Sequence, residues 1–214
     1  MIIIGLTILG AIILLDKYTI GEFGISQPII AGTIIGILCG NTNTGIFIGA
    51  LFQMVFLANL PIGRDVPLDA QAGGVAGCSS YFILRKIGQF EPNFIVVFFI
   101  GLLAAILGSM LDIYMRRINE QLYYRFLRNK SSLSFYHLSG ILTSFMRGII
   151  LFLPLFVIVN FLKFLPIKTA INKEFLMIVV VSLCIANGIY LYSKKNCLFF
   201  FILGALCSLA YFVL

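Results

Sequence analysis

The sequence predicts an all-α integral membrane protein, a polytopic helical bundle with broken or re-entrant hairpins in its N-terminal half. Three observations support this prediction. Apolar residues make up 61% of the 214 residues and charged residues only 11%, whereas soluble domains carry about 25% charged residues. Long uncharged runs recur along the chain, with most charges clustered between them. Glycine and proline interrupt the early runs, as they do in the broken helices of transporters.

This composition excludes two broad classes of protein. A soluble domain with so few charges would expose large apolar patches, and a disordered chain needs low hydrophobicity and high charge. The net charge is +7, but the basic residues stand between apolar runs, so we expect them to meet lipid headgroups and not nucleic acid. The 5 cysteines have no metal-ligand spacing, and neither a disulfide framework, a metal nor another cofactor is expected.

The first half predicts short and interrupted segments. We expect Met1–Leu15 to be a retained membrane segment, because neither a basic leader nor a small-residue cleavage pattern flanks it. Residues 23–63 are uncharged and long enough for two passes, but polar or proline-containing residues interrupt them at 41–45 and 59–61. Ala70–Leu84 is rich in small residues and is too short to cross a bilayer comfortably, which takes about 20 residues. Such segments predict re-entrant helices.

Glycines spaced four residues apart mark the uncharged region. They are Gly32, Gly36 and Gly40, followed by Gly45 and Gly49. On a helix this spacing makes a flat stripe for close packing of a second helix. A ligand approaching the bare backbone is the lesser alternative.

The second half predicts longer spans. Apolar segments lie at Phe94–Leu111, His137–Leu162, Phe175–Ser193 and Asn196–Leu214. Between the first two, Asp112–Ser132 is predicted to be a loop, and its 5 basic against 2 acidic residues place it on the cytoplasmic side. We therefore expect one integral membrane domain over 1–214, with a re-entrant, substrate-path half at 1–92 and a spanning-helix half at 93–214.

Polar residues gather in one part of this apolar chain. Two prolines and a glycine prevent a regular helix between residues 61 and 71. The groups expected to line a small cavity there are Asp65, Asp69, Gln53, Asn59 and Gln71. Carboxylates and amides without a metal-ligand set are suited to the hydroxyls of a sugar. The alternative is a surface loop in which Arg64 pairs with Asp65 and Asp69 caps the following helix.

Two further polar residues interrupt the later apolar runs. Arg147 lies inside an apolar segment, so it must reach a carboxylate, a carbonyl or the headgroup region. We expect a structural or gating ion pair there. His137, the single histidine, is more simply a hydrogen-bonded structural residue than a ligand. No phosphate loop, nucleophile elbow or Cys/His set occurs, so no catalytic residue and no metal site are predicted.

Short motifs along nearly the whole chain carry a family resemblance. They are Glu22-Phe23, Gln27-Pro28-Ile29-Ile30-Ala31, Gly36-Ile37, Gly40, Thr44-Gly45-Ile46, Ile48-Gly49, Gln53-Met54, Ile62-Gly63, Asp69-Ala70, His137 with Ser139, Met146-Arg147, Phe199-Phe200 and Leu203-Gly204. In order and spacing they resemble the membrane-embedded C subunit (IIC) of the mannose/sorbose family of the bacterial phosphoenolpyruvate-dependent sugar phosphotransferase system.

The resemblance implies a partnership and a location. The C subunit would pair with a D subunit, as a trimer of heterodimers in the bacterial inner (plasma) membrane, to form the sugar path. Cytosolic A and B subunits would relay a phosphoryl group to the sugar. The C subunit would be a multi-pass transport subunit, not itself an enzyme.

The candidate sugar contacts are Gln53 and Asp69, followed by Asp65, Asn59 and Gln27, with Arg64 as the expected partner of Asp69. Some of these positions depart from the family pattern. Gln53 stands where the family usually has Glu, Pro61 replaces Asn, and Arg64-Asp65 replace small residues.

Two other functions remain open. One is a degenerate permease acting as a membrane scaffold or regulator for phosphotransferase components, which the altered pocket favours. The other is an autonomous membrane enzyme with Asp65 and Asp69 as an acid–base pair, which lacks a recognisable nucleophile or metal.

Overall fold

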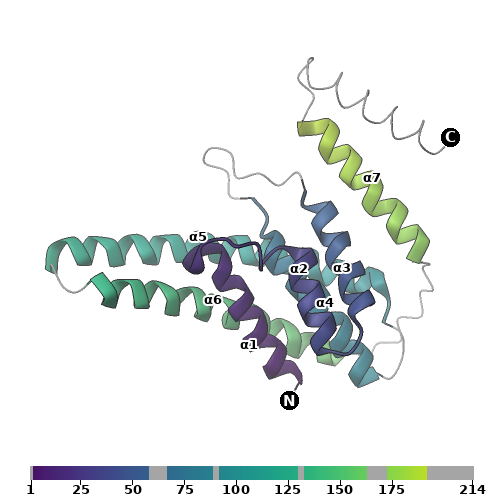
Figure 1. Cartoon of the computed structure of the whole chain (residues 1–214), viewed down its shortest axis with the longest axis horizontal. Coiled ribbons are helices and arrows are strands. Elements are labelled where there is room, and N and C mark those ends of the chain that lie inside the picture. Colours follow the sequence, from purple (N-terminus) through teal and green to yellow (C-terminus); the bar gives the residue numbers. More distant parts are fainter. Residues whose placement is uncertain (1, 58–66, 89–91, 130–132, 163–172, 192–214) are drawn as a thin grey trace.

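Helices form every regular element in the described part of the chain. The computed structural model describes residues 2–57, 67–88, 92–129, 133–162 and 173–191 (Figure 1). The helices, in chain order, are α1 (Ile2–Leu15), the π-helix η1 (Asp16–Ile20), α2 (Pro28–Leu38), α3 (Thr42–Val55), α4 (Ala70–Gly88), α5 (Phe94–Asn129), α6 (Leu133–Leu162) and α7 (Lys173–Leu191). The all-α prediction is confirmed, and α5 and α6 are the described helices that are long and apolar enough to cross a membrane.

α2 and α3 form a helical hairpin. Pro28 begins α2, where its missing N–H costs no hydrogen bond, and Gly40 turns the chain with a φ of +78°. The Asn41 side chain then caps α3 by accepting from the Thr44 N–H at 3.1 Å. Helices of 11 and 14 residues measure about 16 and 21 Å, less than the hydrocarbon core of about 30 Å. Of the predicted interruption at residues 41–45, only Asn41 lies outside the helices, and residues 42–45 form the first turn of α3.

The glycine stripe brings these two helices together. A Cβ built on Gly32 would lie 2.6 Å from the Gly45 carbonyl oxygen, and one built on Gly36 would lie 2.9 Å from the Gly45 Cα. Glycine is thus required because the two backbones touch. The interpretation of the stripe as a helix-packing surface is confirmed for Gly32, Gly36, Gly45 and Gly49, whereas Gly40 lies in the turn, where a Cβ would meet nothing within 4 Å.

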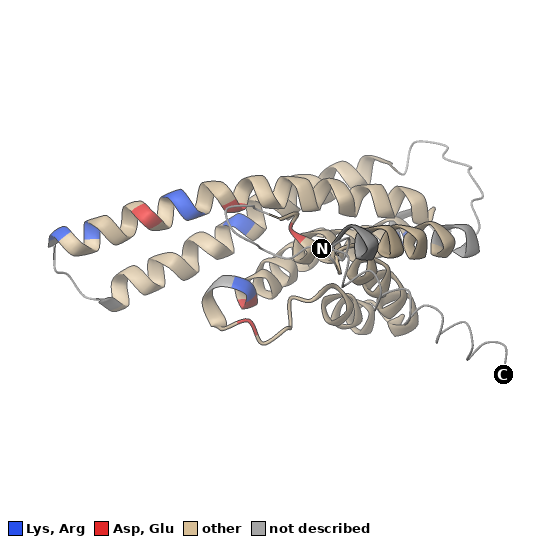
Figure 2. Ribbon diagram, turned by 90° about the horizontal axis from the view of Figure 1, so that it is seen from above, with Lys and Arg blue, Asp and Glu red and all other residues tan. Residues whose placement is uncertain are grey.

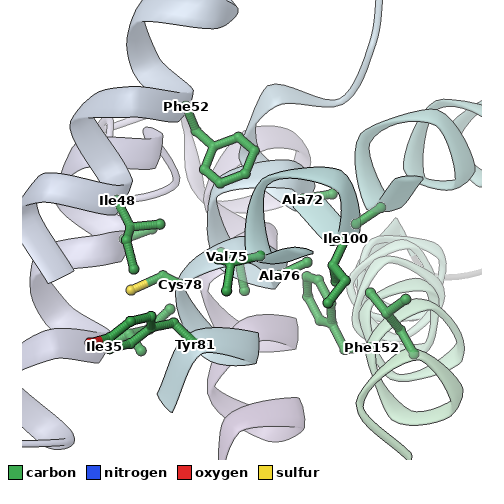
Figure 3. Close-up of a cluster of buried hydrophobic side chains, with 14 of the residues drawn as sticks. Ile35, Ile48, Phe52, Ala72, Val75, Ala76, Cys78, Tyr81, Ile100 and Phe152 are labelled. Carbon is green, nitrogen blue, oxygen red and sulfur yellow. The ribbon is translucent and has the colours of Figure 1, made fainter. Parts of the chain in front are cut away.

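α4 is the central helix of the bundle. All its residues from Ala72 to Leu84 are buried, and it packs against α1, α2, α3, α5 and α6. Figure 3 shows its side chains Val75, Cys78 and Tyr81 among those of neighbouring helices. Ala70–Leu84, which was predicted to be too short to cross a bilayer comfortably, is part of a regular 19-residue helix that continues to Gly88. Its small residues reflect close contact with other helices on all sides.

α5 corrects one prediction. The basic segment Asp112–Ser132 was predicted to be a loop, but α5 continues as one 36-residue helix to Asn129. Neither glycine nor proline occurs between Asp112 and Asn129, and Asp112 forms an (i, i+4) ion pair with Arg116 at 3.2 Å. Charge ends the apolar run here without ending the helix. α5 and α6 project together from the bundle (Figure 1), and the charges of α5 lie on its projecting part (Figure 2).

The remaining spans agree closely with the predictions. α6 begins at Leu133, four residues before the expected His137, and ends at the expected Leu162. α7 covers Lys173–Leu191 against the expected Phe175–Ser193. The predicted span Asn196–Leu214 lies outside the described residues.

Candidate functional site

Asp69 stands at the start of α4 and is the most enclosed of the predicted site residues that the structure describes, with 1% of its surface exposed. Its Oδ1 accepts from the Ala72 N–H at 3.3 Å, which caps the helix as one interpretation of the sequence anticipated. Its own N–H donates to the Ala105 carbonyl of α5 at 3.1 Å. Gly108 lets the two elements approach, because a Cβ there would lie 2.9 Å from the Asp69 Cβ. The carboxylate is therefore held inside the bundle.

Arg147 of α6 is the principal partner of this carboxylate. Its Nη2 donates to Asp69 Oδ2 and to the Gly108 carbonyl at 3.2 Å, and its Nη1 lies 3.8 Å from Asp112 Oδ1. Arg147 thus reaches both a carboxylate and a carbonyl, the two kinds of partner that its place in an apolar run requires. A guanidinium suits this task because its donors are fixed in a planar fork.

Two further basic residues complete an ion cluster. Lys17 of η1 places its Nζ 3.4 Å from Asp69 Oδ1, and Arg116 donates to Asp112 Oδ2 at 3.2 Å. We call Lys17, Asp69, Asp112, Arg116 and Arg147 the ion cluster. It joins η1, α5 and α6 to the start of α4, with three positive and two negative groups. Removing one partner from a buried pair leaves an uncompensated charge, which is strongly destabilising.

Asp16, at the start of η1, is a further buried acid that the sequence reasoning did not single out. Its carboxylate accepts from the Phe23 N–H at 2.9 Å and from the Ser26 N–H and hydroxyl at 3.0 and 3.1 Å. Burial alone would raise the pKa of Asp16, but these hydrogen bonds outweigh it and hold the pKa below its ordinary value. Asp16 thereby shapes the loop that leads to Gln27 and α2. An acid directly after an apolar run was the available signal.

Gln53 presents a buried polar atom near the end of α3. Its Oε1 is buried and has no hydrogen-bond partner among the described residues. Gly49, one turn earlier on the same face, packs against the start of α2, where a Cβ would lie 2.9 Å from the Ile29 Cα. The helix register therefore places Gln53 toward the same end of α2 as Gln27, which precedes that helix and is exposed.

His137 lies apart from the ion cluster. It is exposed on α6, and ten residues separate it from Arg147, which corresponds to about 15 Å along a helix. It lines a cavity of about 290 Å³ together with Thr19, Asn119, Leu122, Tyr123, Phe126, Tyr136, Gly140, Ile141 and Ser144.

Three predicted site residues, Asn59, Arg64 and Asp65, lie outside the described residues. The described partners of Asp69 are Arg147 and Lys17, so its expected pairing with Arg64 stays a prediction. Within the described ranges, no group of three or more His, Cys, Asp or Glu residues is arranged to hold a metal ion.

Comparison with known sequences gives a family match. The family profile described as "PTS system sorbose-specific iic component" matches residues 1–212. The PTS system mannose-specific EIIC component of Escherichia coli (strain K12) is 30% identical over 131 residues, 59% of this chain and 47% of that protein. The Shigella flexneri protein of the same description gives the same values. The chain spans about half the length of the curated relatives it matches.

Comparison with solved structures shows the same fold. A structure described as a membrane protein gives a TM-score of 0.74 at 23% identity, over 97% of this chain and 85% of the other. The mannose transporter ManYZ in complex with microcin E492, solved by cryo-electron microscopy, gives a TM-score of 0.60 at 23% identity and the same coverage.

Proposed function

Because the chain belongs to the mannose/sorbose family of phosphotransferase-system IIC components, a family of membrane transport subunits, we propose that it forms a sugar path together with a D subunit. Cytosolic A and B subunits would phosphorylate the sugar as it emerges, so that this chain needs no phosphorylated residue. The complex would be a trimer of heterodimers in the bacterial inner membrane, which the chain would cross several times. The 1–92 half would carry the substrate path and the 93–214 half the spanning helices.

The ion cluster is the observation that carries this proposal. Charged groups at membrane depth are costly and by default mark a substrate path, a relay or a switch. Here Asp69 and Arg147, which are 1% and 3% exposed, meet where η1, α5 and α6 join the start of α4. Residues 58–66, which contain Asn59, Arg64 and Asp65, lie in the connection between α3 and α4.

We divide the proposed sugar contacts into two groups, one beside α2 and one in the connection between α3 and α4. Gln53 supplies a buried amide oxygen that no described group satisfies. Gln27, which directly precedes α2, lies at the end of α2 toward which Gln53 is placed. Asp65 and Asn59 would add acceptors and donors from the connection between α3 and α4. A hydroxyl bound by such a set satisfies polar groups that would otherwise stay unpaired.

Asp69 would contact the sugar only after Lys17, which acts as a gate, moves away from it. In this conformation its carboxylate is enclosed by donors from Arg147, Lys17 and the Ala72 N–H. A sugar hydroxyl reaches it only when one donor leaves, and Lys17 is the more exposed of its two charged partners, with 19% of its side chain accessible. We propose that sugar binding displaces Lys17 while Arg147 stays, so that binding loosens η1. Arg64 would take part from the adjacent connection, and His137 would act structurally on α6.

Reconstitution with the cognate D subunit tests this function. Binding of labelled mannose and labelled sorbose is measured in vesicles for the wild type, Gln53→Ala and Asp69→Asn. Gln53→Ala is expected to weaken binding about 2- to 10-fold, the value of one hydrogen bond. Gln121→Ala and Glu120→Gln, exposed positions on α5, are matched controls expected to leave binding unchanged. Unchanged binding in both site variants would overturn the sugar contacts.

A membrane scaffold for phosphotransferase components is the second candidate. The enclosure of Asp69 favours it, because a carboxylate held by three donors is suited to a structural role. A wild-type complex that binds neither sugar but still retains the A and B subunits in co-purification would support the scaffold and exclude transport.

A further inference from the structure

A large cavity lies at the opposite end of α4 from the ion cluster. It is open on one side, has a volume of about 920 Å³ and is lined by Ile2, Gly5, Leu6, Ile8, Leu9, Ile12, Leu38, Cys39, Gly40, Asn41, Phe82, Arg85 and Lys86. These residues come from α1, from the turn between α2 and α3 and from the end of α4. Figure 1 shows the start of α1 and this turn at the same end of the molecule. Sixteen residues separate Asp69 from Arg85, about 24 Å along the helix, so the cavity is distinct from the proposed sugar site.

The α1 wall of this cavity is apolar and open. Ile8 and Ile12 expose 43% and 49% of their surface. Gly5 lies between them and the N-terminus, and a Cβ built on it would meet nothing within 4 Å. An exposed apolar surface of this kind in a membrane protein is suited to contact with lipid acyl chains. The wall is therefore accessible to an acyl chain along the length of α1.

The α4 end of the cavity is basic. Arg85 and Lys86 follow the buried part of α4, and Lys86 is exposed. None of the described residues that line the cavity is acidic. Cationic side chains in the last turn are also favoured by the helix dipole, so their position alone has a structural explanation. The helix dipole does not explain why these two side chains line an apolar groove. In that position they place positive charge next to an apolar wall that an acyl chain can reach.

We infer that this cavity binds an anionic phospholipid. The acyl chain would lie against Ile8 and Ile12, and the phosphate would contact Arg85 and Lys86. A basic pocket between membrane helices has the chemistry that recognises anionic headgroups. A zwitterionic lipid would fill the same groove but would bring its own positive charge to two cationic side chains. The site therefore selects for headgroup charge.

Lipid retention measures this selectivity directly. The whole chain is purified in a neutral detergent, supplied with equal amounts of phosphatidylglycerol and phosphatidylcholine, and analysed by native mass spectrometry for bound lipid. The wild type is expected to prefer phosphatidylglycerol about 30-fold, the factor for two basic side chains at about 1 kcal/mol each. Arg85→Ala/Lys86→Ala is expected to abolish the preference. Arg125→Ala/Arg128→Ala, which removes the same charge from exposed positions on α5, is the matched control and is expected to keep it.

A second variant separates the groove from the charge. Gly5→Leu fills the open space on α1 without changing any charge and is expected to reduce the retention of both lipids. It also keeps the test decisive if the double alanine variant does not fold. Equal retention of the two lipids by the wild type, or unchanged retention in Gly5→Leu, would overturn the inference. Loss of bound phosphatidylglycerol on adding inorganic phosphate alone would also overturn it, because the site would then bind free anions and not lipid.

Discussion

α4 and the first half of α5 pack side by side but are built from opposite kinds of residue. α4 is rich in Gly, Ala and Ser, and its residues from Ala72 to Leu84 are all buried. Phe94–Leu111 of α5 is uncharged and bulky, yet Phe99 and Met110 each expose 63% of their surface. In this membrane protein apolarity marks the surface that faces lipid, whereas small size marks burial against other helices. Of these two segments, the more apolar one is therefore not the more central one.

The polar groups extend the comparison. Around the start of α4 they are buried and paired, as Asp69 and Asp16 show. On the projecting part of α5 they are exposed, as at Glu120 and Arg125. The same residue types are thus expected to matter greatly in one region and little in the other.

The largest effect is expected at the buried end of α4. Arg147→Met leaves Asp69 without its principal counter-charge and is expected to lower the free energy of unfolding by about 3–5 kcal/mol. Unfolding is followed with a thiol-reactive dye, because Cys78 is buried in the folded protein. Arg125→Met is the exposed control on α5. Adding Asp69→Asn to Arg147→Met is expected to recover part of the loss, and no recovery would contradict direct coupling of the pair.

Asp16→Asn tests the hydrogen bonds that the buried Asp16 carboxylate accepts from Phe23 and Ser26. Asp16→Asn removes the charge that accepts three hydrogen bonds and is expected to cost about 1.5–3 kcal/mol at neutral pH. Because the native pKa is lowered, the stabilisation is fully present above the ordinary value of 3.8 and is lost as the pH falls through the native pKa. The gap between wild type and variant should therefore narrow below about pH 4. Glu22→Gln, at an exposed position, serves as control, and a gap that widened in acid would contradict the hydrogen-bonded carboxylate.

Gly74→Ala tests whether small size in α4 serves close packing. A Cβ there would lie 2.6 Å from the Pro28 Cβ and 2.8 Å from the Pro28 Cα, so α2 and α4 must separate. The expected cost is about 1–3 kcal/mol, measured by thermal unfolding in detergent. Gly140→Ala, on the projecting part of α6 where a Cβ meets nothing within 4 Å, is the matched control and is expected to be neutral or stabilising. Equal changes in thermal stability for Gly74→Ala and Gly140→Ala would show that small size in α4 does not serve close packing.

The smallest effect is expected on the outer face of α5. Leu103 is 48% exposed, and Leu103→Ala is expected to change the free energy of unfolding by about 0.5 kcal/mol or less. Leu151→Ala, at a position only 4% exposed, should cost about 2–5 kcal/mol. Measuring both in the same detergent isolates burial, since the chemical change is identical. A similar loss for the two variants would show that Leu103 is covered in the folded protein.

Sequence reasoning was most successful where local pattern decides the structure. The starts and ends of α1, α6 and α7 were predicted to within a few residues, and the glycine spacing predicted close packing of a second helix, which the α2–α3 contact confirms. It failed at Asp112–Asn129, because charge was taken as a sign of a loop although the residues remain good helix formers. It underrated α4, because hydropathy measures compatibility with lipid, and α4 contacts other helices instead.

Sequence reasoning likewise identified some residues of the ion cluster and missed others. Asp69 and Arg147 each stood out as charges in an apolar context. The pairing of Asp69 with the neighbouring Arg64 stays a prediction, and the described partners of Asp69 are Lys17 and Arg147, the latter 78 residues further along the chain. Lys17, Asp112 and Asp16 were overlooked, because each lies at the edge of an apolar run where a charge is ordinary.

The sequence by itself determined that this protein is a helical membrane protein of the IIC family, because solvent preference and motif order are properties of the chain. It also determined the α2–α3 hairpin, because glycine spacing and turn residues act locally. Only the tertiary structure decided which charges meet. Electrostatic attraction depends on distance in space and on the local exclusion of water, and both are set when α6 packs beside α4 and α5.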